Sequence, residues 1–77
     1  MNEKNIARRV EYSKIFAVTI YNSLCDKNIS LKTFADDMNI STSEVTKWLS
    51  GHYDFTLKEL IRVEIYLNIE LFDVIKR

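Results

Sequence analysis

The sequence predicts an all-α domain built from five helices, and three observations support this fold class. Apolar residues recur at intervals of three and four positions over most of the 77 residues, which is the spacing of one helix face. The chain contains no proline and a single glycine, so little interrupts a helix. Residues that typically end and start helices stand where this periodicity breaks. A chain of this length forms one domain, residues 1–77, because two cores would each bury too little surface.

The first predicted helix is long and covers about residues 3–27. Its main stripe consists of Ile6, Val10, Ser13, Ala17, Ile20 and Leu24. A second apolar group that widens the buried face consists of Ile15, Phe16, Val18, Tyr21 and Cys25. Such a helix would be roughly 37 Å long, so either it is central to the bundle or its first half packs on a second subunit. We expect Cys25 to be a buried structural thiol and Arg8 and Arg9 to be solvated.

Three pairs of residues predict helix ends: Asn28-Ile29, Asn39-Ile40 and Asn68-Ile69. Asparagine tolerates the left-handed backbone that ends a helix, and the isoleucine after it can pack back on the preceding turn. Ser30 and Ser41 then start the next helices as N-caps. One local solution is therefore expected three times.

Two S/T-x-x-E patterns, Ser41 with Glu44 and Thr56 with Glu59, predict capping boxes at the third and fourth helices. The fourth helix is expected over about residues 57–67. Its apolar residues are Leu57, Leu60, Ile61, Val63, Ile65 and Leu67. A short fifth helix that closes the core or forms an interface is predicted from Leu71, Phe72, Val74 and Ile75.

The central stretch, residues 31–51, has the pattern of two short helices that cross tightly around a turn. Its apolar residues are Phe34, Ala35, Met38, Ile40, Val45 and Trp48. The first three belong to one helical stripe, and Val45 and Trp48 form a second stripe three residues apart. The small side chain of Ala35 is expected where the two helices approach most closely, and Trp48 is expected to be the largest core residue of the motif.

This stretch resembles the helix-turn-helix of the lambda-repressor and Cro type, the XRE family of compact bacterial regulators and antitoxins. The resemblance extends over roughly residues 18–71 and implies a five-helix lambda-repressor-like bundle with its helix-turn-helix at residues 31–50. Two departures stand out. Asparagine replaces the usual glycine at the three helix ends, and Leu31 replaces the glutamine that often braces the DNA backbone at the first motif position.

The resemblance also implies a binding surface for double-stranded DNA. The helix at residues 42–50 would enter the major groove, as the second helix of this motif does. The residues that would face the bases are Thr42, Ser43, Glu44, Thr46 and Lys47. Those that would contact phosphates are Lys32, Ser50, His52 and Tyr53. Alternatively, Glu44 faces the start of its own helix as part of the capping box and contacts no base.

Several functional classes are excluded by the residues present. One histidine and one cysteine, His52 and Cys25, form no catalytic triad, and Asp36 and Asp37 point in different directions on a helix. We therefore expect no enzymatic activity, no cofactor and no metal. The chain lacks an apolar run long enough for a membrane span or a secretory signal, so a cytoplasmic protein is expected.

The charge balance weakens generic affinity for DNA. Eleven Lys and Arg offset eleven Asp and Glu, with +2 over residues 1–27 and −2 over residues 28–55. Weak, salt-sensitive binding to random DNA is the consequence. Two functions follow as hypotheses: a sequence-specific transcriptional regulator that binds as a homodimer, or an antitoxin or accessory module whose main partner is another protein, for example a toxin.

Overall fold

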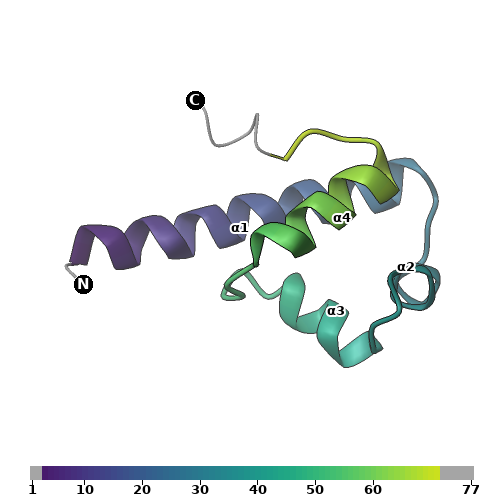
Figure 1. Cartoon of the computed structure of the whole chain (residues 1–77), viewed down its shortest axis with the longest axis horizontal. Coiled ribbons are helices and arrows are strands. Elements are labelled where there is room, and N and C mark those ends of the chain that lie inside the picture. The colour runs from purple at the N-terminus through teal and green to yellow at the C-terminus, as the bar shows by residue number, and fades with distance from the viewer. Residues whose placement is uncertain (1–2, 72–77) are drawn as a thin grey trace.

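The computed structural model describes the backbone of residues 3–71 and the side chains of residues 11–71. Over this range the chain forms helices and no strand (Figure 1): α1 at Glu3–Asp26, α2 at Leu31–Met38, α3 at Thr42–Trp48 and α4 at Leu57–Leu67. The described part of the chain thus contains four helices, where the sequence predicted five for the whole. The predicted fifth helix starts at Leu71, the last described residue, and otherwise lies outside the described residues.

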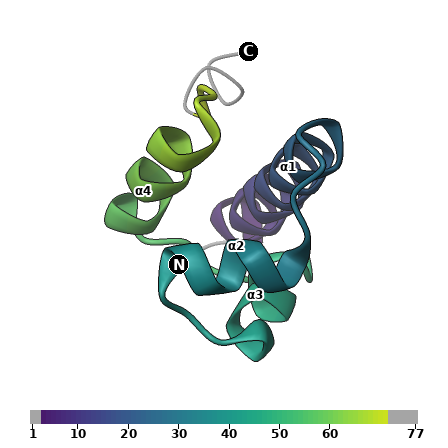
Figure 2. The same cartoon turned by 90° about the vertical axis from the view of Figure 1, so that its right-hand side faces the viewer.

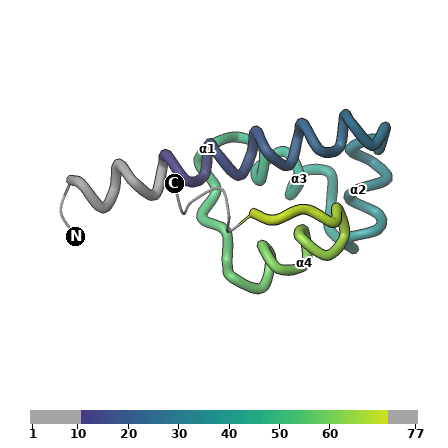
Figure 3. Tube along the Cα trace, turned by 90° about the horizontal axis from the view of Figure 1, so that it is seen from above, coloured from purple at the N-terminus to yellow at the C-terminus, as the bar shows by residue number. Residues whose placement is uncertain are grey.

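The four helices are arranged in two layers. Figures 1 and 3 show α1 and α4 side by side and running in the same general direction. Figure 2 looks nearly along α1 and shows α2 and α3 together below this pair. Contacts join α1 to α4 and α2 to α3. The pair α2 and α3 therefore forms one side of the molecule, with α1 and α4 behind it.

All four helices contribute to one hydrophobic core. Its buried residues are Phe16, Ile20, Leu24, Phe34, Ala35, Met38, Val45, Trp48, Leu60, Val63, Leu67 and Leu71. The two apolar stripes predicted within residues 31–51 are confirmed, because every member of both is at most 3% exposed. Ala35 and Trp48 are each only 1% exposed, so the crossing of α2 and α3 is closely packed.

Each of the three predicted Asn-Ile helix ends is confirmed. Asn28, Asn39 and Asn68 have φ angles of 57°, 58° and 54°, in the left-handed region. The amide of the isoleucine after each asparagine donates to the carbonyl five residues earlier, with N···O distances of 2.9, 2.9 and 3.2 Å. The same isoleucines pack against the core. Local backbone chemistry therefore ends α1, α2 and α4 in the same way.

The predicted N-caps are also confirmed. Ser30 and Ser41 accept the first-turn amides of α2 and α3 on their hydroxyls. At α4 the capping box is complete, because Thr56 Oγ1 accepts from the amide of Glu59 at 3.1 Å and Glu59 Oε1 accepts from the amide of Thr56 at 2.9 Å. As a result α4 starts and ends at the predicted residues, Leu57 and Leu67.

The prediction for the second apolar group of α1 was wrong for three of its members. Val18 and Tyr21 are 58% and 51% exposed, and Cys25 is exposed rather than a buried thiol. At about 100° per residue Val18 and Cys25 lie roughly 100° or more around the helix from Ile20 and Leu24, and Tyr21 lies at the edge of that stripe. The other helices cover the stripe, where Ser13, Ala17, Ile20 and Leu24 are buried as predicted, and also Phe16 of the second group. The side chains of Ile6, Arg8, Arg9 and Val10 lie outside the described residues.

Helix α4 also buries less of its apolar surface than its composition suggested. Leu60, Val63 and Leu67 are buried, whereas the remaining three lie four residues apart along the helix and are exposed by 63%, 42% and 76%: Leu57, Ile61 and Ile65. We call these three residues the α4 stripe. It is an apolar line on the outer side of the helix, away from the core.

Candidate nucleic-acid interface

The turn between α2 and α3 fixes the angle at which the two helices meet. Asn39 ends α2 in the left-handed conformation, and Ser41, extended at φ −79° and ψ 160°, starts α3 two residues later. The rings of Phe34 and Trp48 meet edge to face across the junction, with centroids 6.1 Å apart. Because both ends of the turn are capped and both helices share buried aromatic residues, α3 is held rigidly on α2.

Helix α3 separates its apolar and polar residues onto opposite faces. Val45 and Trp48 are buried, while the polar residues predicted to face bases are exposed except for half-buried Glu44: Thr42, Ser43, Glu44, Thr46 and Lys47. Side chains of different chemistry thus project from one short helix: three hydroxyls, one carboxylate and one ammonium group.

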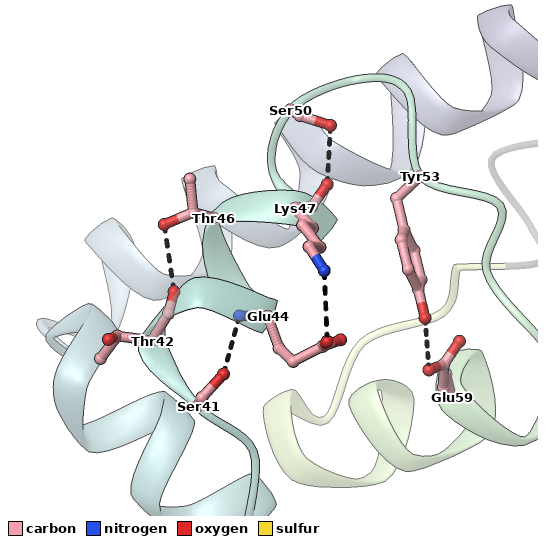
Figure 4. Close-up of polar contacts among 8 residues, drawn as sticks. All are labelled: Ser41, Thr42, Glu44, Thr46, Lys47, Ser50, Tyr53 and Glu59. Atoms are coloured by element: carbon pink, nitrogen blue, oxygen red, sulfur yellow. Dashed lines mark hydrogen bonds and ion pairs between the residues drawn. The ribbon is translucent and has the colours of Figure 1, made fainter.

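Polar contacts order this face, as Figure 4 shows. Thr46 Oγ1 donates to the carbonyl of Thr42 at 3.0 Å, so its hydroxyl proton is used within the helix. Lys47 Nζ lies 3.8 Å from Glu44 Oε1. The capping box predicted at Ser41 is only half formed: Ser41 Oγ accepts from the amide of Glu44 at 3.1 Å, but within the described chain the carboxylate of Glu44 pairs with Lys47 instead.

The loop after α3 contains three of the four residues that were predicted to contact phosphates. Ser50 Oγ donates to the carbonyl of Lys47 at 2.7 Å and accepts from the amide of His52 at 3.1 Å. Tyr53 is half-buried, and its hydroxyl donates to Glu59 Oε2 at 2.7 Å, which raises the pKa of Tyr53. The imidazole of His52 is exposed. The fourth residue, Lys32, is exposed on α2, and Leu31 before it is 41% exposed.

A further basic residue packs against this loop through the aliphatic part of its side chain. Gly51, the single glycine, is buried at φ +84°, a conformation that L side chains rarely adopt, and a Cβ built there would lie 3.2 Å from Cγ of Lys14. Lys14 itself is exposed on α1. Sequence reasoning did not select Lys14, because its proximity to the loop depends on how α1 packs and leaves no local pattern.

Two polar contacts from α4 brace α2. A guanidinium nitrogen of Arg62, Nη2, donates to the carbonyl of Met38, which is one of the unpaired carbonyls at the end of α2. Tyr66 donates from its hydroxyl to Asp37 Oδ2 at 2.6 Å, and its ring packs on Phe34 with centroids 5.5 Å apart. These bracing residues, also missed by sequence reasoning, hold α2 and thereby the polar face of α3 in place.

The arrangement of two helices joined by a capped turn, with the second presenting a polar face, agrees with a family comparison. The family model described as Helix-turn-helix, HTH_3, matches residues 20–74, well over half of the chain. The chain belongs to this XRE-type helix-turn-helix family. No curated protein and no solved structure matches the chain significantly.

The family is one of DNA-binding helix-turn-helix domains, so membership supports DNA binding by this chain. The matched region contains α2, α3 and α4 and the second half of the core stripe of α1. Among residues 3–71, no helix has the length and apolarity to cross a bilayer. The side chains described include no group of three or more His, Cys, Asp or Glu that could hold a metal ion.

The brace of the helix-turn-helix by Tyr66 predicts a dependence of stability on alkaline pH. The hydrogen bond to Asp37, with partial burial and the nearby carboxylate charge, raises the pKa of Tyr66 from 10.0 to about 12. A raised folded-state pKa means that the stabilisation is fully present below pH 10 and is lost as the pH rises towards 12. The difference in unfolding free energy between the wild type and Tyr66→Phe should therefore shrink over this interval, as measured by urea unfolding at several pH values.

Tyr21→Phe is the matched control for this measurement, because Tyr21 is an exposed tyrosine on α1. It removes the same hydroxyl without touching α2. A difference between the wild type and Tyr66→Phe that stays constant over the whole interval would contradict the brace.

Proposed function

We propose that the chain is a sequence-specific DNA-binding transcriptional regulator that reads the major groove with α3 and the residue or two after it. The observation that carries this proposal is the polar face of α3, which projects from a helix whose other face is buried in the core. In the helix-turn-helix docking geometry, such a face contacts base edges. A preorganised face loses little conformational freedom on binding, which favours affinity.

The base contacts that we propose involve the α3 residues Thr42, Ser43, Glu44, Thr46 and Lys47. Hydroxyls can meet several base edges, the methyl group of threonine can touch the methyl of thymine, and an ammonium group can reach the guanine acceptors. Because Thr46 donates its proton to the carbonyl of Thr42, it would offer the bases a methyl group and acceptor lone pairs.

Phosphate contacts are proposed for residues around α3, namely Lys32, Ser50, His52 and Tyr53, with Lys14 added by the packing of α1 against Gly51. To donate to a phosphate, the hydroxyls of Ser50 and Tyr53 would first release the Lys47 carbonyl and Glu59. Such contacts fix the register of the protein on the duplex. Lys14 adds a positive charge from the N-terminal part of the chain, which carries the excess of basic residues. It thereby offsets the acidic charge of the segment that contains α2 and α3.

We also propose that the protein binds as a homodimer. Helix α3 has only seven residues, so one copy contacts few base pairs, and proteins with this motif gain selectivity by placing two recognition helices on neighbouring half-sites. The exposed α4 stripe of Leu57, Ile61 and Ile65 supports an interface between copies, since it is an apolar surface that the described chain does not cover.

A second candidate function rests on the same exposed apolar residues. The α4 stripe, together with Val18 and Tyr21 on α1, gives the described chain two apolar surfaces that a different protein could cover. In this version the protein is an antitoxin or accessory factor, and its binding to DNA is weak or serves autoregulation.

The test is selection of bound duplexes from a random DNA library at physiological salt. The regulator function predicts an enriched motif with two half-sites about one helical turn apart, bound with a Kd of roughly 10⁻⁸ to 10⁻¹¹ M. Protein shown to be folded by circular dichroism that enriches no sequence would contradict the regulator function and favour the protein-binding one.

A further inference from the structure

Glu44 and Lys47 place an acceptor and a donor side by side on the polar face of α3. The two side chains lie one turn apart, with Glu44 Oε1 3.8 Å from Lys47 Nζ, and they are 41% and 67% exposed (Figure 4). An exposed pair of this kind adds little to the stability of a helix. Its position on the face proposed to meet DNA is therefore more informative than its contribution to stability.

A carboxylate on this face requires an explanation, because the phosphates of DNA repel it. The structure removes the simplest one, a role as the second half of a capping box, since the carboxylate of Glu44 is directed to Lys47. At a base edge a carboxylate is favourable only where it accepts from an exocyclic amino group. Glu44 would thus be tolerated opposite a donor and penalised elsewhere.

The major-groove edges of the base pairs show which base pair suits Glu44 and Lys47 together. In the major groove a C·G pair presents the cytosine N4 amino donor next to the guanine O6 and N7 acceptors. Glu44 can accept from N4 while Lys47 donates to O6 and N7. At an A·T pair the adenine N6 amino group lies between two acceptors, N7 and O4, and both repel a carboxylate, whereas cytosine N4 has an acceptor on one side only. Lys47 would there reach N7 or O4, which lie on opposite sides of N6, instead of the adjacent O6 and N7 of guanine. The acceptor and donor pair is therefore complementary to C·G.

We infer that Glu44 and Lys47 together read one C·G base pair in each half-site of the operator. This inference rests on the proposed regulator function and deepens it, since it assigns a base pair to two named side chains. In the free protein each group neutralises the other. On the operator, both exchange this contact for contacts to a single base pair, whereas on other DNA Glu44 faces an acceptor or a phosphate.

The experiment compares motifs selected by the wild type and by Glu44→Gln, followed by fluorescence anisotropy on duplexes that differ at one base pair. The wild type should select C·G at one position of each half-site and lose affinity roughly 5- to 100-fold when that pair is changed. Glu44→Gln should shift the preference there towards adenine, because an amide pairs with adenine N6 and N7. The other positions of the motif should stay unchanged.

A charge-exchange variant, E44K with K47E, gives a second readout. It reverses the order of donor and acceptor along α3, so the preferred pair should invert from C·G to G·C. The exchange opposes the helix dipole, so its melting temperature is measured alongside. A wild-type motif whose C·G content does not respond to Glu44→Gln would overturn the inference while leaving the regulator function in place. A folded wild-type protein that enriches no motif would overturn both.

Discussion

Replacement of Thr46 and Lys47 together by alanine is expected to abolish binding to the selected operator and leave the fold intact. Both side chains are exposed on α3, and neither contributes to the core. The loss of two base contacts in each of two half-sites, at about 1–3 kcal/mol per contact, would lower the affinity by about a thousandfold or more. Electrophoretic mobility shift and fluorescence anisotropy with the selected duplex measure this loss.

Stability should change little in the same variant, because the effects oppose one another. Alanine is a better helix former than threonine or lysine. Against this, the variant loses the bond from Thr46 to the carbonyl of Thr42 and the exposed pair of Lys47 with Glu44. The thermal midpoint should therefore stay within a few degrees of the wild-type value.

A matched control lies on α1. Thr19 Oγ1 donates to the carbonyl of Ile15 at 2.7 Å, the same contact with the preceding turn that Thr46 makes, and Lys27 is an exposed lysine just after the end of that helix. The double replacement of Thr19 and Lys27 by alanine removes the same atoms away from α3. It should retain operator binding. Operator affinity that survives the α3 variant would rule out α3 as the reading helix.

The largest expected loss of stability is that of Trp48→Ala. Trp48 is 1% exposed, and its ring packs against Phe34, Tyr53 and Phe55 with centroids 6.1, 6.0 and 5.5 Å away. Truncation of a buried tryptophan costs about 3–5 kcal/mol, a large share of the roughly 4–12 kcal/mol that a domain of this size has. The melting temperature should fall by more than about 12 °C. A DNA-binding measurement on Trp48→Ala is therefore informative only where circular dichroism shows that the variant is folded.

Trp48→Phe tests how much of this loss comes from the missing aromatic ring. The indole Nε1 is buried and has no hydrogen-bond partner of good geometry within the described chain, so the polar contact that phenylalanine removes is limited to a weak interaction with the Tyr53 hydroxyl. It retains an aromatic ring among the three neighbours and should lose clearly less stability than the alanine variant. Thermal and urea unfolding monitored by circular dichroism measure both variants. An alanine variant that melts like the wild type would contradict the central role of Trp48 in the core.

The helix ends and most of the core followed from local chemistry and could be predicted. Each helix end depends on residues within five positions of each other, so a local pattern is enough to predict it. This holds for the left-handed asparagines, the serine caps and the Thr56 capping box. The burial of Phe34, Ala35 and Trp48 followed from periodicity. The exposure of Thr42, Ser43, Thr46 and Lys47 agrees with the predicted reading face, and their contacts with bases stay a prediction.

Other features depended on which helix surfaces pack against each other, and the periodicity of apolar residues could not predict them. The exposure of Cys25 and of the α4 stripe reflects how far the neighbouring helices extend around α1 and α4. The choice of Glu44 between its own helix start and Lys47 is a balance of two weak local contacts, which the capping pattern does not decide.

Local sequence was enough to predict that this chain forms helices, where most of them start and end, and that residues 31–51 form a helix-turn-helix, because each of these follows largely from interactions between near neighbours. The third helix, expected to reach residue 50, ends at Trp48. The contacts that hold the motif in place could be seen only in the folded chain. Tyr66 reaches Asp37 across 29 positions, Arg62 reaches Met38 across 24, and Lys14 comes to lie beside Gly51. Such contacts arise from the packing of whole helices, and no local pattern of residues records them.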